Sequence, residues 1–196
     1  MAQYAALLRG INVGGTNLIK MPELRRCFEA LGFGDVATYI QSGNVLFEAA
    51  EVLAYGRGPA DLSARIEEAL SEWFGYRARI VLRSHGQMRA IVADAPAGFG
   101  SQPDRYRYDV VFLREPLTAA EAMQDLRTRE GVDQAFAGDG ACYFSRLISR
   151  AAQSYLSRIV ALPVYQSMTI RNWNTTVNLR ALMDARAEGP RRPPPP

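Results

Sequence analysis

The sequence predicts an α+β protein of two ferredoxin-like subdomains, each with the order β-α-β-β-α-β, followed by a C-terminal helix. Its 196 residues, 48% hydrophobic and 22% charged, have an ordinary globular composition. Short apolar runs alternate with amphipathic helical stripes, and the same alternation occurs twice. We interpret the repetition as an internal duplication, with one subdomain at 1–94, a linker at 95–104, a second subdomain with the C-terminal helix at 105–186, and a disordered Pro-rich tail at 187–196.

The first half begins with an apolar run that is typical of a buried strand, and the helix that follows has Pro22 in its first turn. Gly32 ends this helix, and the loop at 41–43 is short enough to join two strands as a hairpin. Asp61 or Ser63 is the expected cap of the second helix. The predicted strands are 4–11, 36–41, 44–48 and 79–83. The apolar faces of the helices are Leu24, Cys27, Phe28 and Leu31, and then Leu62, Ile66, Leu70 and Trp73 or Phe74.

After a short helical piece around Met88, the second half repeats the plan. A stripe of apolar residues between 148 and 159 stands where the second helix of this half belongs. Asn172 or Asn174 is the expected cap of the last helix. The predicted strands are 108–113, 134–137, 141–145 and 167–171. The apolar positions are Ala119, Ala122, Met123 and Leu126 in the first helix and Val177, Leu179, Leu182 and Met183 in the last.

Charge and hydropathy exclude several classes of protein. Most of the net charge of +3 comes from arginines in the tail, so the body is close to neutral, unlike that of a strong nucleic-acid binder. No apolar run approaches the ~20 residues that span a bilayer, and the N-terminus lacks the features of a secretory signal. We therefore expect a cytoplasmic protein without a membrane partner. Lys20 is the sole lysine, which together with abundant arginine suggests a GC-rich bacterial genome.

Cysteine and histidine are scarce, and this limits the chemistry. Cys27 and Cys142 lie far apart in the sequence and have no partner at metal-ligand spacing, so we interpret them as buried free thiols. His85 is the only histidine, and every His/Cys zinc site, catalytic triad or Cys-His dyad would have to use it. We expect no metal site, and the sequence indicates no cofactor.

The segment RGINVGGTNLIK, residues 9–20, leaves a strand and enters a helix. Its Gly14-Gly15 pair permits positive φ and a close approach to the backbone. Backbone N–H groups at such a turn can hold an anion, with Arg9 and Lys20 adding positive charge. The alternative is a connecting loop whose Thr16 or Asn17 caps the helix, because the pattern matches no known phosphate-binding motif.

The predicted topology brings a second segment to this loop. In a β-α-β-β-α-β sheet the first two strands run in the same direction, so the loop after the first strand and the hairpin after the second lie at one edge. Polar side chains around a flexible backbone suit a small polar or anionic ligand, although Asn and Ser also form turns. The candidate residues at this edge are Arg9, Asn12, Gly14, Gly15, Asn17, Lys20, Tyr39, Gln41, Ser42 and Asn44.

A third polar segment, TIRNWNTT at 169–176, precedes the last helix. Arg171 offers a cation and Trp173 a stacking face, while Asn172 is either a ligand-binding residue or the helix cap. Core packing of Trp173 is the alternative. We add these three residues to the candidate site.

These segments together resemble a known family. The strings ALLRGINVGGTNLIKMPELRRCFEALGF, TYIQSGNVLF and TIRNWNTT are similar to those of the bacterial family DUF1697, a domain of unknown function. The resemblance implies an α+β protein with two ferredoxin-like subdomains, and it carries no established activity, cofactor or catalytic residue. The chain departs from the family at Asn178, where a basic residue is usual, so an anion held by that charge would be held less well here.

The preferred interpretation is a binding protein for a small polar or anionic ligand at the edge formed by the RGINVGG loop and the QSGN hairpin. An enzyme of unknown reaction that uses the same cleft is the alternative. A weak single-stranded nucleic-acid binder is less favoured, because the central strands of the first half offer only Tyr4 and Phe47 for base stacking. An interaction scaffold is a further possibility. The sequence does not indicate the oligomeric state.

Overall fold

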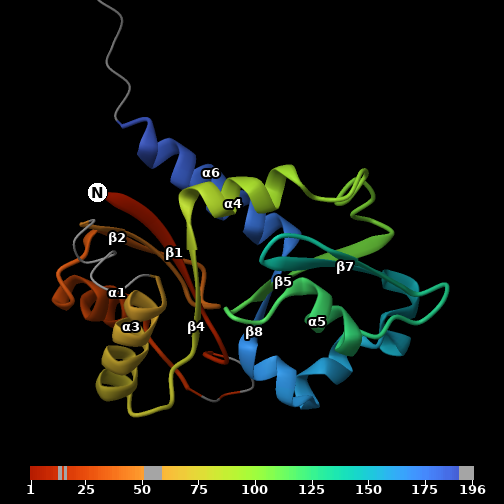
Figure 1. Ribbon diagram of the computed structural model, residues 1–196, viewed down its shortest axis with the longest axis horizontal. Helices are drawn as coiled ribbons and strands as arrows, with labels where there is room; N and C mark the ends of the chain where they lie inside the picture. The colour runs from red at the N-terminus through yellow and green to blue at the C-terminus, as the bar shows by residue number, and fades with distance from the viewer. Residues whose placement is uncertain (13–14, 16, 51–58, 190–196) are drawn as a thin grey trace, which may run out of the picture.

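Two four-stranded antiparallel sheets and a C-terminal helix form this mixed α+β protein (Figure 1). The computed structural model describes residues 1–12, 15, 17–50 and 59–189. The first sheet has the strand order β2-β3-β1-β4, and the second has the corresponding order β6-β7-β5-β8. The elements of the first half are β1 (Ala2–Leu8), α1 (Met21–Ala30), β2 (Gly34–Tyr39), β3 (Asn44–Ala49), α3 (Pro59–Phe74), β4 (Ile80–Ser84) and α4 (His85–Ala93).

The second half follows the same order until its second helix. The apolar stripe at 148–159 forms short 3-10 helices, not the α-helix expected in this place. The Oδ2 atom of Asp133 accepts from the backbone N–H of Tyr155, and the hydroxyl of Ser154 accepts from that of Leu156, so both N–H groups are taken from an α-helical ladder. The elements are β5 (Tyr106–Leu113), α5 (Ala119–Asp125), β6 (Asp133–Ala137), β7 (Ala141–Leu147), η1 (Ile148–Gln153), η2 (Leu156–Ala161), η3 (Pro163–Ser167), β8 (Met168–Asn172) and α6 (Trp173–Ala187).

Helix ends and faces resolve three alternatives left by the sequence. Helix α3 begins at Pro59, upstream of both expected caps, Asp61 and Ser63. Phe74 packs against the core while Trp73 is 48% exposed. Asn172 caps α6, because its side chain accepts a hydrogen bond from the backbone N–H of Thr175 at 2.7 Å.

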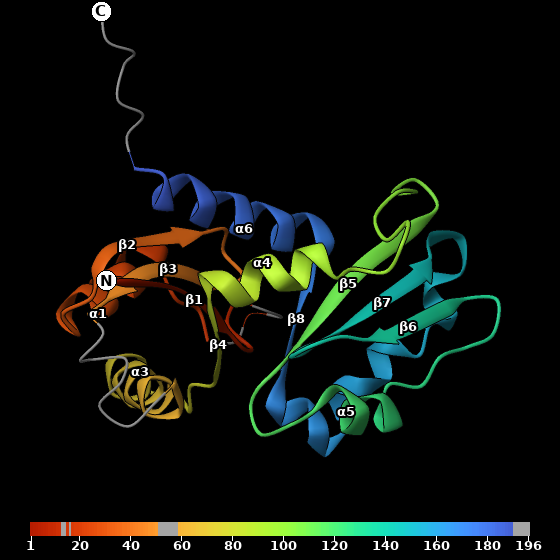
Figure 2. The ribbon, with the colours of Figure 1, turned by 45° about the horizontal axis from the view of Figure 1, so that its top comes forward.

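Each sheet is buried on both faces. Helices α1 and α3 cover one face of the first sheet, while α5 and the 3-10 segments cover one face of the second. The remaining two faces meet α4 and α6, which lie side by side across both sheets (Figure 2). This shared core contains residues from both sheets and from both helices, namely Ala5, Leu7, Leu46 and Val81 of the first sheet, Val110, Phe112, Ala141 and Tyr143 of the second, and Met88, Ile91, Leu179 and Met183 of α4 and α6.

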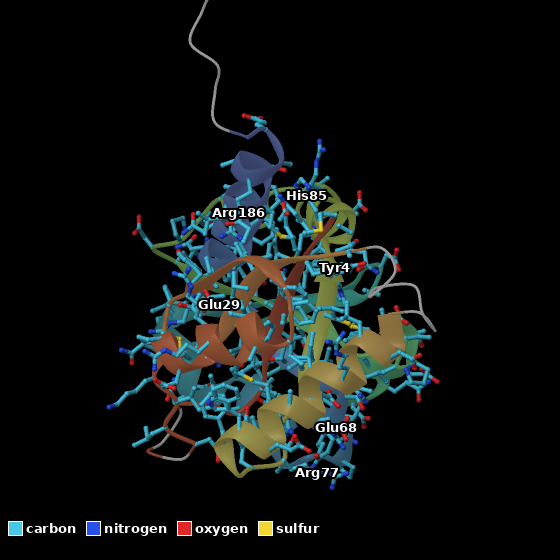
Figure 3. All side chains as sticks on the ribbon, turned by 90° about the vertical axis from the view of Figure 1, so that its left-hand side faces the viewer. Tyr4, Glu29, Glu68, Arg77, His85 and Arg186 are labelled. Atoms are coloured by element: carbon cyan, nitrogen blue, oxygen red, sulfur yellow. The ribbon has the colours of Figure 1, made fainter. Side chains whose placement is uncertain are left out.

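The helix pair is antiparallel, so the start of α4 lies beside the end of α6. His85 and Arg186, labelled in Figure 3, stand near one another at that end. The imidazole Nε2 of His85 is 2.7 Å from Asp184 Oδ1, and Arg180 contacts the other carboxylate oxygen at 2.8 Å. The sole histidine therefore joins two helices.

In the described part of the chain no helix is long and apolar enough to cross a bilayer.

The β2–β3 hairpin packs directly on the segment that follows β1. Gly43 has a φ of +76°, and a Cβ placed there would lie 2.5 Å from Ile11 Cδ1 and 2.9 Å from Leu8 Cβ. Its carbonyl accepts from the Leu8 N–H at 2.8 Å. Only glycine fits at this contact, because both the backbone conformation and the available space exclude a side chain.

We predict that Gly43→Ala is more destabilising than Gly32→Ala. Both glycines have positive φ, but a Cβ at Gly32 would meet nothing within 4 Å. Gly32→Ala should therefore cost about 1 kcal/mol, the usual penalty for a left-handed residue, and Gly43→Ala roughly 2 kcal/mol more because of the overlap. Urea unfolding measures both. Equal losses would show that the hairpin moves away from Ile11 without cost.

Candidate functional site

Asn12 joins the loop after β1 to the hairpin. Its Nδ2 donates to the carbonyls of Gln41 at 2.9 Å and Ile19 at 3.0 Å, while its Oδ1 accepts from the Ile19 N–H at 2.8 Å. A single amide thus closes the loop on itself and fastens it to a segment that lies 29 residues away. The convergence predicted from the topology is therefore present in the structure.

Residues in the left-handed backbone conformation shape the described part of this loop. Gly10, Asn12, Gly15 and Asn17 all have positive φ. Asn17 donates from Nδ2 to the Gly10 carbonyl at 2.9 Å, and its own carbonyl accepts from the Asn12 N–H at 3.2 Å. Asparagine tolerates this conformation better than other non-glycine residues, which explains the alternation of Gly and Asn. The predicted site residue Gly14 and the alternative cap Thr16 lie outside the described residues.

Ile40, in the hairpin, carries strain that the sequence analysis did not single out. Its φ is +50°, although β-branched side chains rarely adopt the left-handed region. Its side chain is exposed, as is that of Leu18 across the edge. Two exposed apolar side chains thus flank the polar residues of this edge.

Arg171 lies buried beneath the edge, and its donors are all directed at neutral acceptors. Its Nε donates to Asn44 Oδ1 at 2.6 Å, and Nη1 donates to Thr169 Oγ1 at 2.8 Å. The remaining contacts are carbonyl groups: Nη1 with Ile170 at 2.9 Å, and Nη2 with Leu8 at 2.7 Å, Ser42 at 3.0 Å and Gly43 at 3.3 Å. Burial lowers the pKa of this guanidinium to about 10.

Arg171 and Asn44 are therefore part of the framework below the site. Asn44 is fully buried, and its Nδ2 donates to the Tyr39 carbonyl at 2.9 Å and to Ser42 Oγ at 3.1 Å. Its amide closes the hairpin and receives the Arg171 guanidinium in the same place. Ser42 contributes its carbonyl to Arg171 and its hydroxyl to Asn44, so it too serves the framework.

Arg9, Lys20 and Gln41 remain as the side chains at this edge that hydrogen-bond to no described group. Lys20 and Gln41 are exposed, and the Arg9 guanidinium lies 4.6 Å over the Tyr165 ring of the second half. The Nε of Arg9 is buried without a hydrogen-bond partner. Within the ranges 1–12, 15, 17–50 and 59–189, no carboxylate lies at ion-pair distance from Arg9, Lys20 or Arg171.

Helix α6 also reaches the edge. Asn178 Nδ2 donates to the Tyr39 hydroxyl at 2.9 Å, although the two residues are 139 positions apart. Asn178 is exposed beside the hairpin. Asn178 therefore joins α6 to the hairpin at this edge.

Asn172 and Trp173, which the sequence analysis grouped with Arg171, line a different cavity. Trp173 packs edge-on against Phe99, with ring centroids 5.2 Å apart, and Asn172 is the cap of α6. Both line a hollow of about 330 Å³ at the start of β5. The structure separates Arg171 from these two residues, because Arg171 points between the two sheets, whereas Trp173 opens the helix that follows.

The remaining predictions concern nucleic acid, thiols and metals. Tyr4 and Phe47 are only 8% and 1% exposed and stack with centroids 5.8 Å apart in the core, so they offer no platform for bases. Both cysteines are free and buried, as expected, and burial raises the pKa of each thiol to about 11. Across the described ranges, no cluster of three or more His, Cys, Asp or Glu side chains is arranged to hold a metal ion.

Comparisons with known proteins agree with this architecture. A family model described as a protein of unknown function (DUF1697) matches residues 1–144. Among the curated proteins none matches. A solved structure of the conserved bacterial protein SP0830 from Streptococcus pneumoniae is similar over 93% of this chain and 98% of that chain, with a TM-score of 0.78 and 25% sequence identity.

We predict that Arg171→Met lowers the free energy of unfolding by about 3 kcal/mol or more. The substitution keeps an apolar side chain of similar length but leaves the buried Asn44 Oδ1 and the Leu8 carbonyl without a donor, at roughly 1–3 kcal/mol each. Arg25→Met is the matched control, because Arg25 forms only an exposed ion pair with Glu29 and should lose less than about 0.5 kcal/mol. Equal midpoints in urea unfolding would contradict a framework role for Arg171.

Proposed function

The chain belongs to the DUF1697 family of proteins of unknown function, and on that premise we propose that it binds a small anionic ligand at the loop–hairpin edge. The edge consists of the segment after β1, the β2–β3 hairpin and Asn178 of α6. Arg9, Lys20 and Gln41 are the residues that would contact the ligand.

One observation carries the proposal. Three cationic side chains lie at or beneath one edge, and no described carboxylate pairs with any of them. Nearby arginines of the same interface do have a carboxylate, since Arg79 and Arg114 both contact Glu67 Oε2 at 3.0 Å. The loop–hairpin edge therefore has an unbalanced positive charge, which favours an anion.

The framework would support binding by holding the edge in place before a ligand arrives. Asn12, Asn44 and Arg171 occupy their hydrogen-bonding groups within the protein, so the loop and the hairpin are preorganised. The charge of Arg171 still acts through the low-dielectric interior, where it is screened less than an exposed charge. Its role is thus electrostatic support without direct contact.

We further infer that the two halves arose by duplication of one ferredoxin-like unit. The two sheets have corresponding strand orders, and Ser84 and Asn172 cap equivalent helices after β4 and β8. Gly43 and Gly140 occupy equivalent hairpins, each accepting from the last residue of the neighbouring strand. The boundaries predicted at 1–94, 95–104 and 105–186 remain part of this proposal, and most of the tail from 187 lies outside the described residues.

We predict that a panel of inorganic phosphate, pyrophosphate and sugar phosphates contains a compound that raises the melting temperature. A ligand at 100 times its dissociation constant stabilises the native state by about 2.7 kcal/mol. Arg9→Ala and Gln41→Ala should abolish the shift, whereas Arg25→Ala, in α1 and paired with Glu29, should leave it intact. A shift that survives both edge variants would place the site elsewhere.

We also predict that Asn178→Lys increases affinity for the same anion. The substitution adds a positive charge beside Tyr39, at a position that is exposed in this chain, and should tighten binding several-fold at low salt. Isothermal titration at two ionic strengths measures the change, with Asn178→Gln as the uncharged control. Unchanged affinity for the lysine variant would show that the anion does not reach α6.

A further inference from the structure

The cavity at the start of β5 differs from the loop–hairpin edge in position and in chemistry. It has a volume of about 330 Å³, within the range of small-molecule pockets. Strand β8 ends at Asn172, opposite Asp109, so the first residues of β5 extend beyond their neighbouring strand and border the cavity. Its principal walls are Tyr106, Arg107, Tyr108, Asp109, Arg146 and Trp173.

Aromatic rings make up much of the wall. Tyr106 and Tyr108 have ring centroids 6.1 Å apart, and Tyr108 is held edge-on by Phe99 at 4.9 Å. Phe99 also contacts Trp173 at 5.2 Å, so one half-buried ring supports two rings that line the cavity. The Tyr108 hydroxyl accepts from the Gln102 N–H at 3.3 Å, which fixes that ring further. Rings held in this way are suited to stacking on a flat ligand.

Two side-chain donors border the rings without partners among the described residues. The indole N–H of Trp173 donates to no described residue. The side-chain NH₂ of Asn172 is likewise unused among the described contacts, because only its oxygen takes part in capping α6. Donors beside flat rings match the acceptor atoms on the edge of a heterocyclic base.

The charges favour a ligand that is also anionic. Asp109 is buried, but Arg146 Nη2 lies 3.1 Å from its Oδ2 and neutralises it. Arg107 is exposed and pairs with no described carboxylate, so the cavity keeps a net positive charge. The first residues of α6, Trp173 and Asn174, add the positive end of a helix. Aromatic rings and a carboxylate could also hold an organic cation, but the net positive charge of the cavity would repel a cationic ligand.

We propose that this cavity binds a nucleotide, with the base against Tyr106 and Tyr108 and the phosphate toward Arg107 and the start of α6. The Trp173 and Asn172 donors would contact the polar edge of the base. The site is independent of the anion site proposed above, because the two share no residue.

Intrinsic fluorescence of a Trp73→Phe variant tests the proposal directly. The chain has two tryptophans, and Trp73 is exposed on α3, so the variant leaves Trp173 as the sole reporter without disturbing the core. Titration with AMP, GMP, CMP and UMP, excited at the red edge of indole absorption, should give saturable quenching with at least one of them. The matching nucleoside should bind more weakly.

Two variants in the Trp73→Phe background locate the ligand. Arg107→Ala, at an exposed position that should not affect folding, should weaken nucleotide binding about tenfold and leave nucleoside binding unchanged. Tyr106→Ala should weaken both about tenfold, as expected for loss of a stacked ring worth roughly 1–3 kcal/mol. Arg77→Ala is the matched control, because Arg77 is exposed at the far end of α3 (Figure 3).

Three results would overturn the proposal. The first is the absence of saturable quenching by all four nucleotides, and the second is binding that is unchanged in both Arg107→Ala and Tyr106→Ala. The third is binding that Arg9→Ala abolishes while Arg107→Ala leaves it intact, since this would assign the nucleotide to the loop–hairpin edge. Pyrophosphate binding lost only in Arg9→Ala would support the first site without bearing on this one.

Discussion

The structure depends on two buried arginines, one from each sheet, and each of them donates hydrogen bonds to the opposite sheet. Arg171 of β8 donates to the carbonyls of Leu8, Ser42 and Gly43, at the edge of the first sheet. Arg83 of β4 occupies the equivalent position and donates to the carbonyls of Leu113 and Gly140, at the edge of the second sheet. Strand ends and hairpins expose carbonyls that β-pairing leaves unmatched, and burying them without donors would be costly. The exchange of guanidinium groups allows both edges to be buried against each other.

This exchange explains why the candidate anion site can be both polar and ordered. The loop after β1 has little regular structure, yet Asn12 fastens it to the hairpin and Arg171 fastens the hairpin to the second sheet. Each link is a hydrogen bond to the backbone, so it fixes the position of the chain and leaves Arg9, Lys20 and Gln41 for other partners. At the equivalent place in the second half, Glu115 and Asp139 lie near Arg83 and offset its charge.

The sequence was informative where local periodicity or topology determines structure. The stripe of Leu24, Cys27 and Phe28 predicted α1 because a helix repeats every 3.6 residues, and the parallel direction of β1 and β2 was enough to bring Asn12 to Gln41. The sequence was uninformative where the hydrogen-bond partner of a side chain or backbone group lies far along the chain. Nothing local to Arg171 shows that its donors meet Leu8, 163 residues away, and nothing local to Tyr155 shows that Asp133 accepts its N–H and interrupts the helical stripe there.

The distance between Leu8 and Arg171 along the chain also bears on how the protein is made. During synthesis β1, β2 and β3 are complete long before β8 leaves the ribosome. For most of that time the carbonyls of the first sheet therefore lack the guanidinium of Arg171. Helix α6, which covers the inner faces of both sheets, is later still. The emerging first half therefore exposes an apolar face and bare carbonyls that attract other chains.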